Sequence, residues 1–344
     1  MKSKMSLMVL TFLLLGLFIV FSPLRQMFTS QTKAPPLEGG EQKASNQVQV
    51  VTLGENPGYF DIALLDNGKV FAVNRLSPYP ERLFVSNDEG RSWSFIIAPT
   101  KGKGSGMYDI TFIDNKHGWI AGFMQVLFTS DGGETWEKVG GPNAYEISKV
   151  RFINTQVGYT VSRVERGCRI FRTTDGGRSW KKQYEDLESG FLFDLAALNE
   201  NIAVAAINDQ YLLRTEDGGR KWQVVEPKIG GAAGLTFAPD GTGWVVGRKG
   251  SFYYSTDQGR SWQRPANLPD SLLSYQWYSI AFMDTKRGIA VGDKGAMAVT
   301  YDGGTSWVEV KTGIKERLGD VKINGERVIV RGQENFYKVV FPPA

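Results

Sequence analysis

Four aspartates are the residues of this chain best suited to acid–base chemistry. Asp61, Asp109, Asp194 and Asp320 each begin a short apolar stretch, at equivalent points of a sequence repeat. Two carboxylates that face each other across a channel mouth can serve a glycosidase. The alternative is structural, because an aspartate at the start of a strand can hydrogen-bond neighbouring backbone. Chemistry needs asymmetry and these residues recur at one repeat position, so we favour the structural interpretation and predict no catalytic residue.

Other catalytic and cofactor sites have weak support in the sequence. His117 is the only histidine, which excludes a multi-histidine metal site and leaves a single candidate for a Ser–His–Asp triad. It lies in the segment NKHGW, a predicted turn, so we expect a structural role. The glycine-rich stretch Lys101–Gly106 lacks the following helix that phosphate binding needs. We therefore predict no metal, no cofactor and no enzyme activity.

Six copies of one motif, S/T-x-D-x-G-x-S/T/K-W, predict the strands that position these residues. The copies are Ser86–Trp93, Thr129–Trp136, Thr173–Trp180, Thr215–Trp222, Ser255–Trp262 and Thr300–Trp307. Their aspartates are Asp88, Asp131, Asp175, Asp217, Asp257 and Asp302, and their tryptophans are Trp93, Trp136, Trp180, Trp222, Trp262 and Trp307. The aspartates are 43, 44, 42, 40 and 45 residues apart. A period in the forties with a hairpin signal in every unit predicts a β-propeller.

The motif has a mechanical explanation as a hairpin turn. Asp can hydrogen-bond local backbone N–H groups, and Gly tolerates a positive φ. The Trp offers a large apolar surface for packing between neighbouring hairpins. The boxes resemble the Asp-box, or BNR, repeat of bacterial sialidases, sortilin-type receptors and xyloglucan-cleaving glucanases. That resemblance implies a fold element away from the ligand face, so we assign these aspartates a structural role.

Each repeat also carries two earlier strand signals, such as Tyr108–Asp114 and Gly118–Phe123. We therefore predict four antiparallel strands per blade and no helix after the N-terminus. The C-terminal tail supplies three more strands without a box, and VQVVTL at Val48–Leu53 can supply the fourth. The prediction is an all-β, seven-bladed propeller over 48–344, whose last blade both termini close, leaving no open edge there.

The N-terminus predicts a membrane anchor. Met5–Phe21 is almost wholly apolar and follows Lys2 and Lys4, so residues 1–4 should be cytoplasmic and 5–24 should form a transmembrane helix. A cleaved signal peptide is the alternative. Residues 25–47 are predicted to be a flexible linker. The propeller would then be held outside the cytoplasm by a single-pass signal anchor.

Composition adds few constraints on partners. The net charge is +4, which permits an anionic partner without requiring one. Cys168 is the only cysteine, so the ring has no internal disulfide, and we expect this thiol to be inert. The predicted location outside the cytoplasm and the modest net charge argue against binding of nucleic acid. We expect the protein to be a monomer.

The face opposite the Asp boxes is predicted to bind a partner. Its loops are rich in arginine and aromatic residues, the composition of protein-binding hot spots. The predicted contacts are Arg75, Tyr79, Arg82, Lys101, Lys103, Arg163, Arg166, Arg169, Tyr275 and Trp277. Ordinary solvated charge is the alternative for any single residue. Tyr275 and Trp277 could also stack on sugars, which leaves a carbohydrate-binding or glycoside hydrolase propeller as a second hypothesis.

The second repeat, YDITFIDNKHGWIAG followed by TSDGGETW, resembles the photosystem II assembly-factor family. The resemblance covers nearly all of the chain after Val48. It implies a non-enzymatic seven-bladed propeller of the thylakoid lumen that chaperones a membrane complex, partly through an arginine-rich patch. Arg163, Arg166 and Arg169 would be the local equivalent of that patch. We therefore expect a membrane-anchored, extracytoplasmic scaffold or assembly factor that binds a subunit of a membrane complex.

Overall fold

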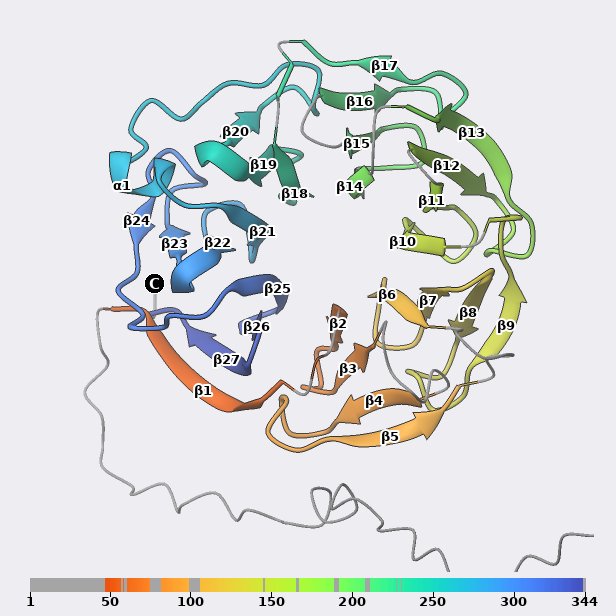
Figure 1. Ribbon diagram of the computed structural model, residues 1–344, viewed down its shortest axis with the longest axis horizontal. Coiled ribbons are helices and arrows are strands. Elements are labelled where there is room, and N and C mark those ends of the chain that lie inside the picture. The colour runs from red at the N-terminus through yellow and green to blue at the C-terminus, as the bar shows by residue number, and fades with distance from the viewer. Residues whose placement is uncertain are drawn as a thin grey trace, which may run out of the picture. The chain divides into compact units, whose positions relative to one another are not determined.

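The computed structural model describes residues 47–342, apart from 57, 59–60, 75–81, 99–105, 145, 165–166, 189–191, 208–210, 227 and 230. These residues form seven antiparallel sheets, the blades, arranged in a ring (Figure 1). This confirms the predicted seven-bladed, all-β architecture.

The blades follow the chain in order, each starting with its inner strand. Blade one contains β2 (Asp61–Leu64), β3 (Val70–Val73), β4 (Arg82–Ser86) and β5 (Ser94–Ile97). Blade two contains β6 (Met107–Phe112), β7 (Gly118–Gly122), β8 (Gln125–Thr129) and β9 (Glu137–Gly140). Blade three contains β10 (Glu146–Phe152), β11 (Gly158–Val164), β12 (Gly167–Thr173) and β13 (Lys181–Asp186). Blade four contains β14 (Leu192–Ala197), β15 (Ala203–Ile207), β16 (Tyr211–Thr215) and β17 (Gln223–Val224).

The remaining blades complete the ring. Blade five contains β18 (Ala232–Phe237), β19 (Gly243–Gly247) and β20 (Phe252–Ser255). Blade six contains β21 (Trp277–Phe282), β22 (Gly288–Gly292), β23 (Met297–Thr300) and β24 (Val308–Glu309). Blade seven contains β25 (Leu318–Asn324), β26 (Arg327–Gly332), β27 (Asn335–Val340) and β1 (Gln49–Glu55).

Blade seven closes the ring with strands from both ends of the sequence, as predicted. β1 runs antiparallel to β27, with Gln49 opposite Val340. Asn56 extends the closure, because its backbone N–H donates to the carbonyl of Glu334 at 2.6 Å and its side-chain amide donates to the carbonyl of Gly332 at 2.7 Å. The N-terminal strand is therefore an integral outer strand of the last blade.

Blade five departs from the predicted four strands. In blades four and six the third residue after the box tryptophan, Val225 or Val310, donates its backbone N–H to the third strand, at 2.9 and 2.8 Å. In blade five that position is Pro265, which has no N–H to donate. The fourth strand is consequently reduced to one bridge between Tyr254 and Gln263.

The Asp boxes form closed hydrogen-bond loops. Asp88 accepts from the hydroxyl of Ser86 at 2.7 Å, and from the backbone N–H and the hydroxyl of Ser92 at 2.8 and 2.6 Å. The hydroxyl of Ser86 accepts from the backbone N–H of Gly90 at 2.7 Å, and Trp93 donates its indole N–H to the carbonyl of Gly90 at 3.1 Å. Both carboxylate oxygens of this aspartate thus serve its own turn.

The core lies between adjacent blades. Trp119 of blade two is fully buried and stacks on Phe152 of blade three, with ring centroids 3.8 Å apart. Both faces of the middle strands are covered, which explains the continuous apolar runs of β7, β15, β19 and β22. Burial between blades therefore holds the inner strands around the axis.

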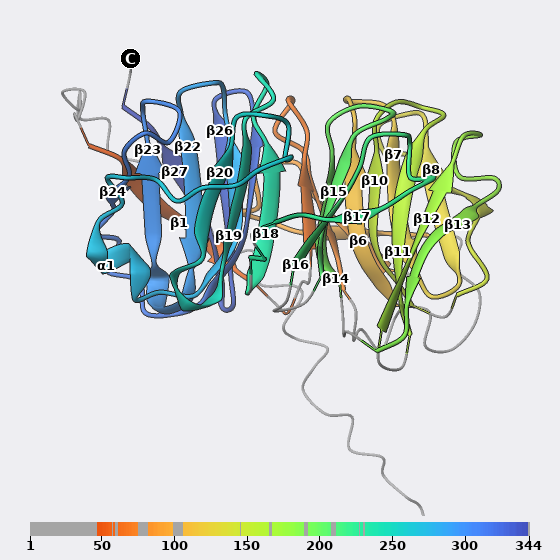
Figure 2. The ribbon, with the colours of Figure 1, turned by 90° about the horizontal axis from the view of Figure 1, so that it is seen from above.

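The strands run between two different faces of the ring (Figure 2). One face carries the Asp boxes and the turns from inner to second strands, which touch where the N–H of Gly132 donates to the carbonyl of Lys116. The other carries the loops that enter the inner strands, including α1 (Asp270–Leu273), one helical turn that the sequence did not predict. Among the described residues no helix is long and apolar enough to cross a membrane, and the predicted span at 5–24 lies outside them.

Candidate functional site at the channel mouth

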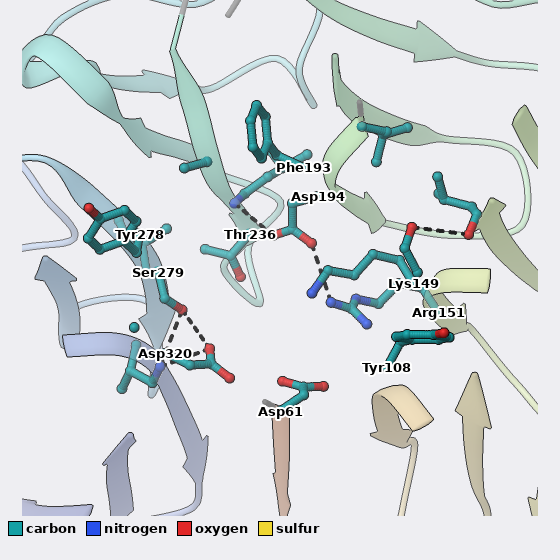
Figure 3. A pocket seen from close by; sticks show the side chains of 18 of the residues that line it. Asp61, Tyr108, Lys149, Arg151, Phe193, Asp194, Thr236, Tyr278, Ser279 and Asp320 are labelled. Carbon is teal, nitrogen blue, oxygen red and sulfur yellow. Dashed lines mark hydrogen bonds and ion pairs between the residues drawn. The ribbon is translucent and has the colours of Figure 1, made fainter. Parts of the chain in front are cut away.

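A cavity of about 650 Å³ lies on the axis of the ring, where residues of all seven inner strands line it. It opens among the starts of those strands, on the face opposite the Asp boxes. Figure 3 shows Asp61, Lys149, Arg151, Asp194 and Asp320 reaching toward it, from blades one, three, four and seven. The predicted channel mouth and the aspartates expected there are thus found together, although fully buried Asp109 does not line the cavity.

Six of the seven inner strands begin with a register shift one residue before the aspartate position. In β6, for example, Met107 pairs with Gly122 and Asp109 with Ala121, so Tyr108 is bulged out of the ladder. A bulge redirects side chains at the end of a strand. The bulged residues all line the cavity, and they are Tyr108, Ser148, Phe193, Ala233, Tyr278 and Gly319.

The aspartates tie each inner strand to the next blade. Asp61 accepts from the backbone N–H of Ile110 at 3.0 Å, and Asp109 accepts from that of Val150 at 2.9 Å. Asp194 accepts in the same way from Leu235 at 3.1 Å. Asp320 instead accepts from the hydroxyl of Ser279 of the preceding blade at 2.9 Å. This geometry agrees with the structural interpretation of the aspartates.

Three cations complete a belt of ion pairs below the mouth. Asp109 binds Lys149 at 3.0 Å and Arg151 at 2.6 Å, and Arg151 also reaches Asp194 at 3.3 Å. Lys322 lies 3.3 Å from Asp61 and 3.1 Å from Asp320. Buried charges of this kind persist only when they are paired. Each of the four carboxylates therefore has a cationic partner within the protein, although they share three cations.

The belt is poorly arranged for glycoside hydrolysis. Burial alone would raise the pKa of Asp61, but Lys322 and Lys149 outweigh it and hold that pKa well below its usual range. Burial raises the pKa of Asp109, although Arg151 and Lys149 oppose the rise. Asp109 is 0% exposed, so the carboxyl with the raised pKa cannot reach a substrate. Neither Asp61 nor Asp109 therefore offers the accessible, protonated carboxyl that a glycosidase uses as its acid.

The rim above the belt is basic and aromatic. The guanidinium of Arg317 lies 3.9 Å from the ring centroid of Tyr278, and that of Arg248 lies 5.6 Å from the centroid of Phe193. Both arginines are exposed and line the cavity, as does Arg163. The rim can therefore attract anionic groups and pack against apolar ones.

Eight of the ten predicted partner-binding residues divide into three groups. Arg163 is exposed at the end of β11 and lines the cavity, as a contact residue would. Arg169 is half-buried and its guanidinium donates to Glu185, which offsets its charge. Arg75, Tyr79, Lys101, Lys103 and Arg166 lie outside the described residues, as does the side chain of Arg82.

Trp277 is a correction to the predicted binding face. It is 0% exposed, because the loop before it folds into α1 and covers it. Its indole N–H donates to the carbonyl of Leu272 at 2.9 Å. Tyr275 is half-buried and donates its hydroxyl to Glu309 at 3.0 Å. Trp277 therefore cannot stack on a sugar or a partner, and the carbohydrate hypothesis loses its main aromatic residue.

His117 and Cys168 have structural surroundings. The Nδ1 atom of His117 is 2.8 Å from Asp114 in the turn after β6, on the Asp-box face. Cys168 is buried against the cavity wall, and this burial raises the pKa of its thiol to about 12. The thiol is thus protonated at neutral pH and a poor nucleophile.

Sequence reasoning missed several residues of the site. Lys149 and Arg151 gave no signal, because their partners lie in other blades, and the pairing of Lys322 with Asp61 also joins different blades. Phe193 and Tyr278 do have a sequence signal. An aromatic residue directly precedes the aspartate position in the pairs Tyr108–Asp109, Phe193–Asp194 and Tyr278–Ser279.

Comparisons with known proteins agree with this architecture. Residues 253–264 match the BNR/Asp-box repeat family. Photosystem II assembly protein Ycf48 of Thermosynechococcus vestitus is 28% identical over 296 residues, covering 72% of this chain and 79% of the relative. Photosystem II assembly lipoprotein Ycf48 of a Nostoc species is 25% identical over 296 residues, covering 72% and 81%.

Solved structures share the fold. YCF48 bound to D1 peptide has a TM-score of 0.67 at 18% identity, over 87% of this chain and 98% of the other. The GH74 enzyme of Niastella koreensis has a TM-score of 0.61 at 16% identity, over 85% of this chain and 44% of the other. At these identities the likeness shows the fold alone, and that fold serves enzymes and other proteins alike. This chain is a seven-bladed β-propeller of Asp-box repeats, and it resembles the photosystem II assembly proteins named Ycf48.

Proposed function

We propose that this chain is a non-catalytic scaffold, an assembly factor that holds a segment of a membrane-complex subunit at the channel mouth. The observation that carries the proposal is the basic and aromatic rim of Arg163, Arg248 and Arg317 above a belt of paired charges. Such a rim has the composition of a binding hot spot, while the carboxylates beneath it are committed to structure.

The relatives favour the same role. They are named for photosystem II assembly, and one solved structure of that name contains a D1 peptide. The partner of this chain would be a subunit of a membrane complex, bound through one polypeptide segment.

A membrane anchor would suit this role. We propose that residues 5–24 remain uncleaved and that the linker 25–47 leads to a propeller outside the cytoplasm. A linker of this length has a root-mean-square span of roughly 25–30 Å. It would raise the effective concentration of the ring near membrane partners, so a weak interface would suffice. A reporter that is active only outside the cytoplasm, fused after Ala344, should be active, and the chain should resist carbonate extraction. A shortened, soluble product would contradict the anchor.

Crosslinking in native membranes, followed by mass spectrometry, tests the scaffold. The test variant combines Arg163→Glu, Arg248→Glu and Arg317→Glu, which reverses charge at the rim without touching the core. The matched control combines Arg178→Glu, Arg220→Glu and Lys286→Glu, which reverses three exposed charges on the Asp-box face.

The wild type and the control should capture the same membrane protein, and the rim variant should lose it. Equal capture by all three would show that the rim is not the binding face. Absence of any membrane protein from the wild-type sample would count against the scaffold itself.

A further inference from the structure

The bulged residues at the mouth alternate in size around the ring. The even-numbered blades two, four and six contribute Tyr108, Phe193 and Tyr278. The odd-numbered blades three, five and seven contribute Ser148, Ala233 and Gly319. All six line the same cavity, so the mouth consists of aromatic faces separated by gaps.

Two arginines lie over the aromatic residues of this alternating set. Arg248 follows β19 of blade five and lies over Phe193 of blade four, at 5.6 Å. Arg317 precedes β25 of blade seven and lies over Tyr278 of blade six, at 3.9 Å. Each arginine therefore comes from a blade whose bulged residue is small, and crosses to the aromatic ring of the blade before it.

Stacking changes what an arginine can do. A free arginine side chain loses much rotamer entropy when it binds an anion. A guanidinium held flat against an aromatic ring has lost part of that freedom already, and the N–H groups along its edge remain able to donate to a carboxylate. Phe193 and Tyr278 would thus act as positioning residues for Arg248 and Arg317.

The belt beneath the rim determines which charge the site attracts. The belt holds four carboxylates, Asp61, Asp109, Asp194 and Asp320, which share the three cations Lys149, Arg151 and Lys322 at distances of 2.6 to 3.3 Å. With the rim arginines Arg163, Arg248 and Arg317 added, the belt and the rim together hold six cations against four carboxylates, a net charge of +2 that favours an anionic ligand. The two guanidinium groups lie over the aromatic rings of blades four and six, and this separation favours a ligand with several negative charges along an extended chain.

We infer that the mouth binds an acidic stretch of extended polypeptide, with Phe193 and Tyr278 holding Arg248 and Arg317 as two preset anion-binding arms. This inference rests on the proposed function and names the chemistry of the segment bound.

The test is binding of a fluorescent hexaglutamate peptide to the full chain in detergent, measured by anisotropy, with a hexaglutamine peptide for comparison. Phe193→Leu and Tyr278→Leu keep both arginines and remove the stacking. Each should weaken binding of the glutamate peptide about two- to fivefold. The slope of log affinity against log salt should stay unchanged, because no charge is lost. Arg248→Gln and Arg317→Gln should weaken binding and also flatten that slope.

Two controls separate positioning from general damage. Tyr253→Leu removes another stacked pair, with Arg264 at 4.9 Å, which does not line the cavity, and binding should be unaffected. Phe193→Tyr and Tyr278→Phe retain an aromatic face and should bind the peptide like the wild type.

Two results would overturn the inference: wild-type affinity in both leucine variants, or equal binding of the glutamine peptide. A wild type that captures a membrane protein on crosslinking but ignores the glutamate peptide overturns the acidic ligand and leaves the scaffold intact. If the wild type captures no membrane protein on crosslinking, that result would instead contradict the proposed function.

Discussion

Glu89 offers a measurement of how strongly the ring is closed. It occupies the middle of the first Asp box with φ 61°, where four other boxes have glycine at φ 71° to 75°. A non-glycine residue in this region costs about 1–2 kcal/mol. The side chain of Glu89 binds Lys338 at 2.7 Å and Arg327 at 3.2 Å, both in blade seven. The strained residue therefore joins the first boxed blade to the last.

Gln258 is a matched reference for this position. It occupies the same place in the fifth box, also with φ 61°, and its side chain is exposed. Replacing it with glycine removes the strain and adds unfolded-state entropy, for a net gain of about 0.5–1 kcal/mol. Glu89→Gly gains the same amount but loses two partly buried ion pairs, worth about 1–2 kcal/mol together. Glu89→Gly should thus be destabilising by about 0.5–1 kcal/mol, opposite in sign to Gln258→Gly.

The assay is thermal and urea unfolding of the two variants beside the wild type. A difference of about 1–2 kcal/mol between them corresponds to roughly 2–8 °C in Tm. In high salt the Glu89→Gly loss should shrink, whereas the Gln258→Gly gain should persist. Equal shifts for the two variants, or a loss for Glu89→Gly that salt does not change, would refute the stabilising role of the ion pairs from Glu89 to Lys338 and Arg327.

Three further predictions follow from the fold. The pKa of Asp131 is lowered from 3.8 to about 2, mainly by the hydroxyl of Thr135. Because the folded value is the lower one, this stability is present above about pH 4 and is lost toward pH 2. The Tm gap between wild type and Asp131→Asn should narrow over that range, and a constant gap would contradict it. Pro265→Val should restore a donor to the outer edge of blade five, seen as a slowly exchanging amide at position 265; rapid exchange there would show that Pro265 is not the cause. Deletion of residues 1–54 removes most of β1 and its pairing with β27, at a loss of about 5 kcal/mol. Deletion of 1–44 should leave Tm unchanged, and equal melting of the two truncations would argue against closure by β1.

The local chemistry of the Asp boxes made the blades predictable. Each box contains its own hydrogen-bond partners within a few residues, so the pattern alone shows a turn. The closure by β1 followed from counting, since three unboxed strands at one end matched one at the other. Pro265 was visible in the sequence, but its effect depends on which backbone N–H the neighbouring strand needs.

The site was less predictable because its contacts join different blades. Arg151 reaches Asp109 and Asp194, each more than forty positions away, and no local pattern marks such a pairing. Trp277 looked like a surface aromatic because it follows a long polar loop, but that loop folds back over it. Aspartates at one repeat position gave the location of the channel mouth, while the arginines that give the mouth its character depend on the alternation of bulged residues.

The pairing of Gln49 with Val340 also determines when this protein can finish folding. Of the strands that the structure describes, β1 leaves the ribosome first and its partner β27 last. At roughly 5–20 residues per second, the first strand waits about 15–60 s for the other. During that interval a strand edge stays open at the end of the chain that bears the apolar N-terminal segment. A cell that makes this protein must therefore keep an unfinished ring from pairing with its neighbours until the last strand has been synthesised.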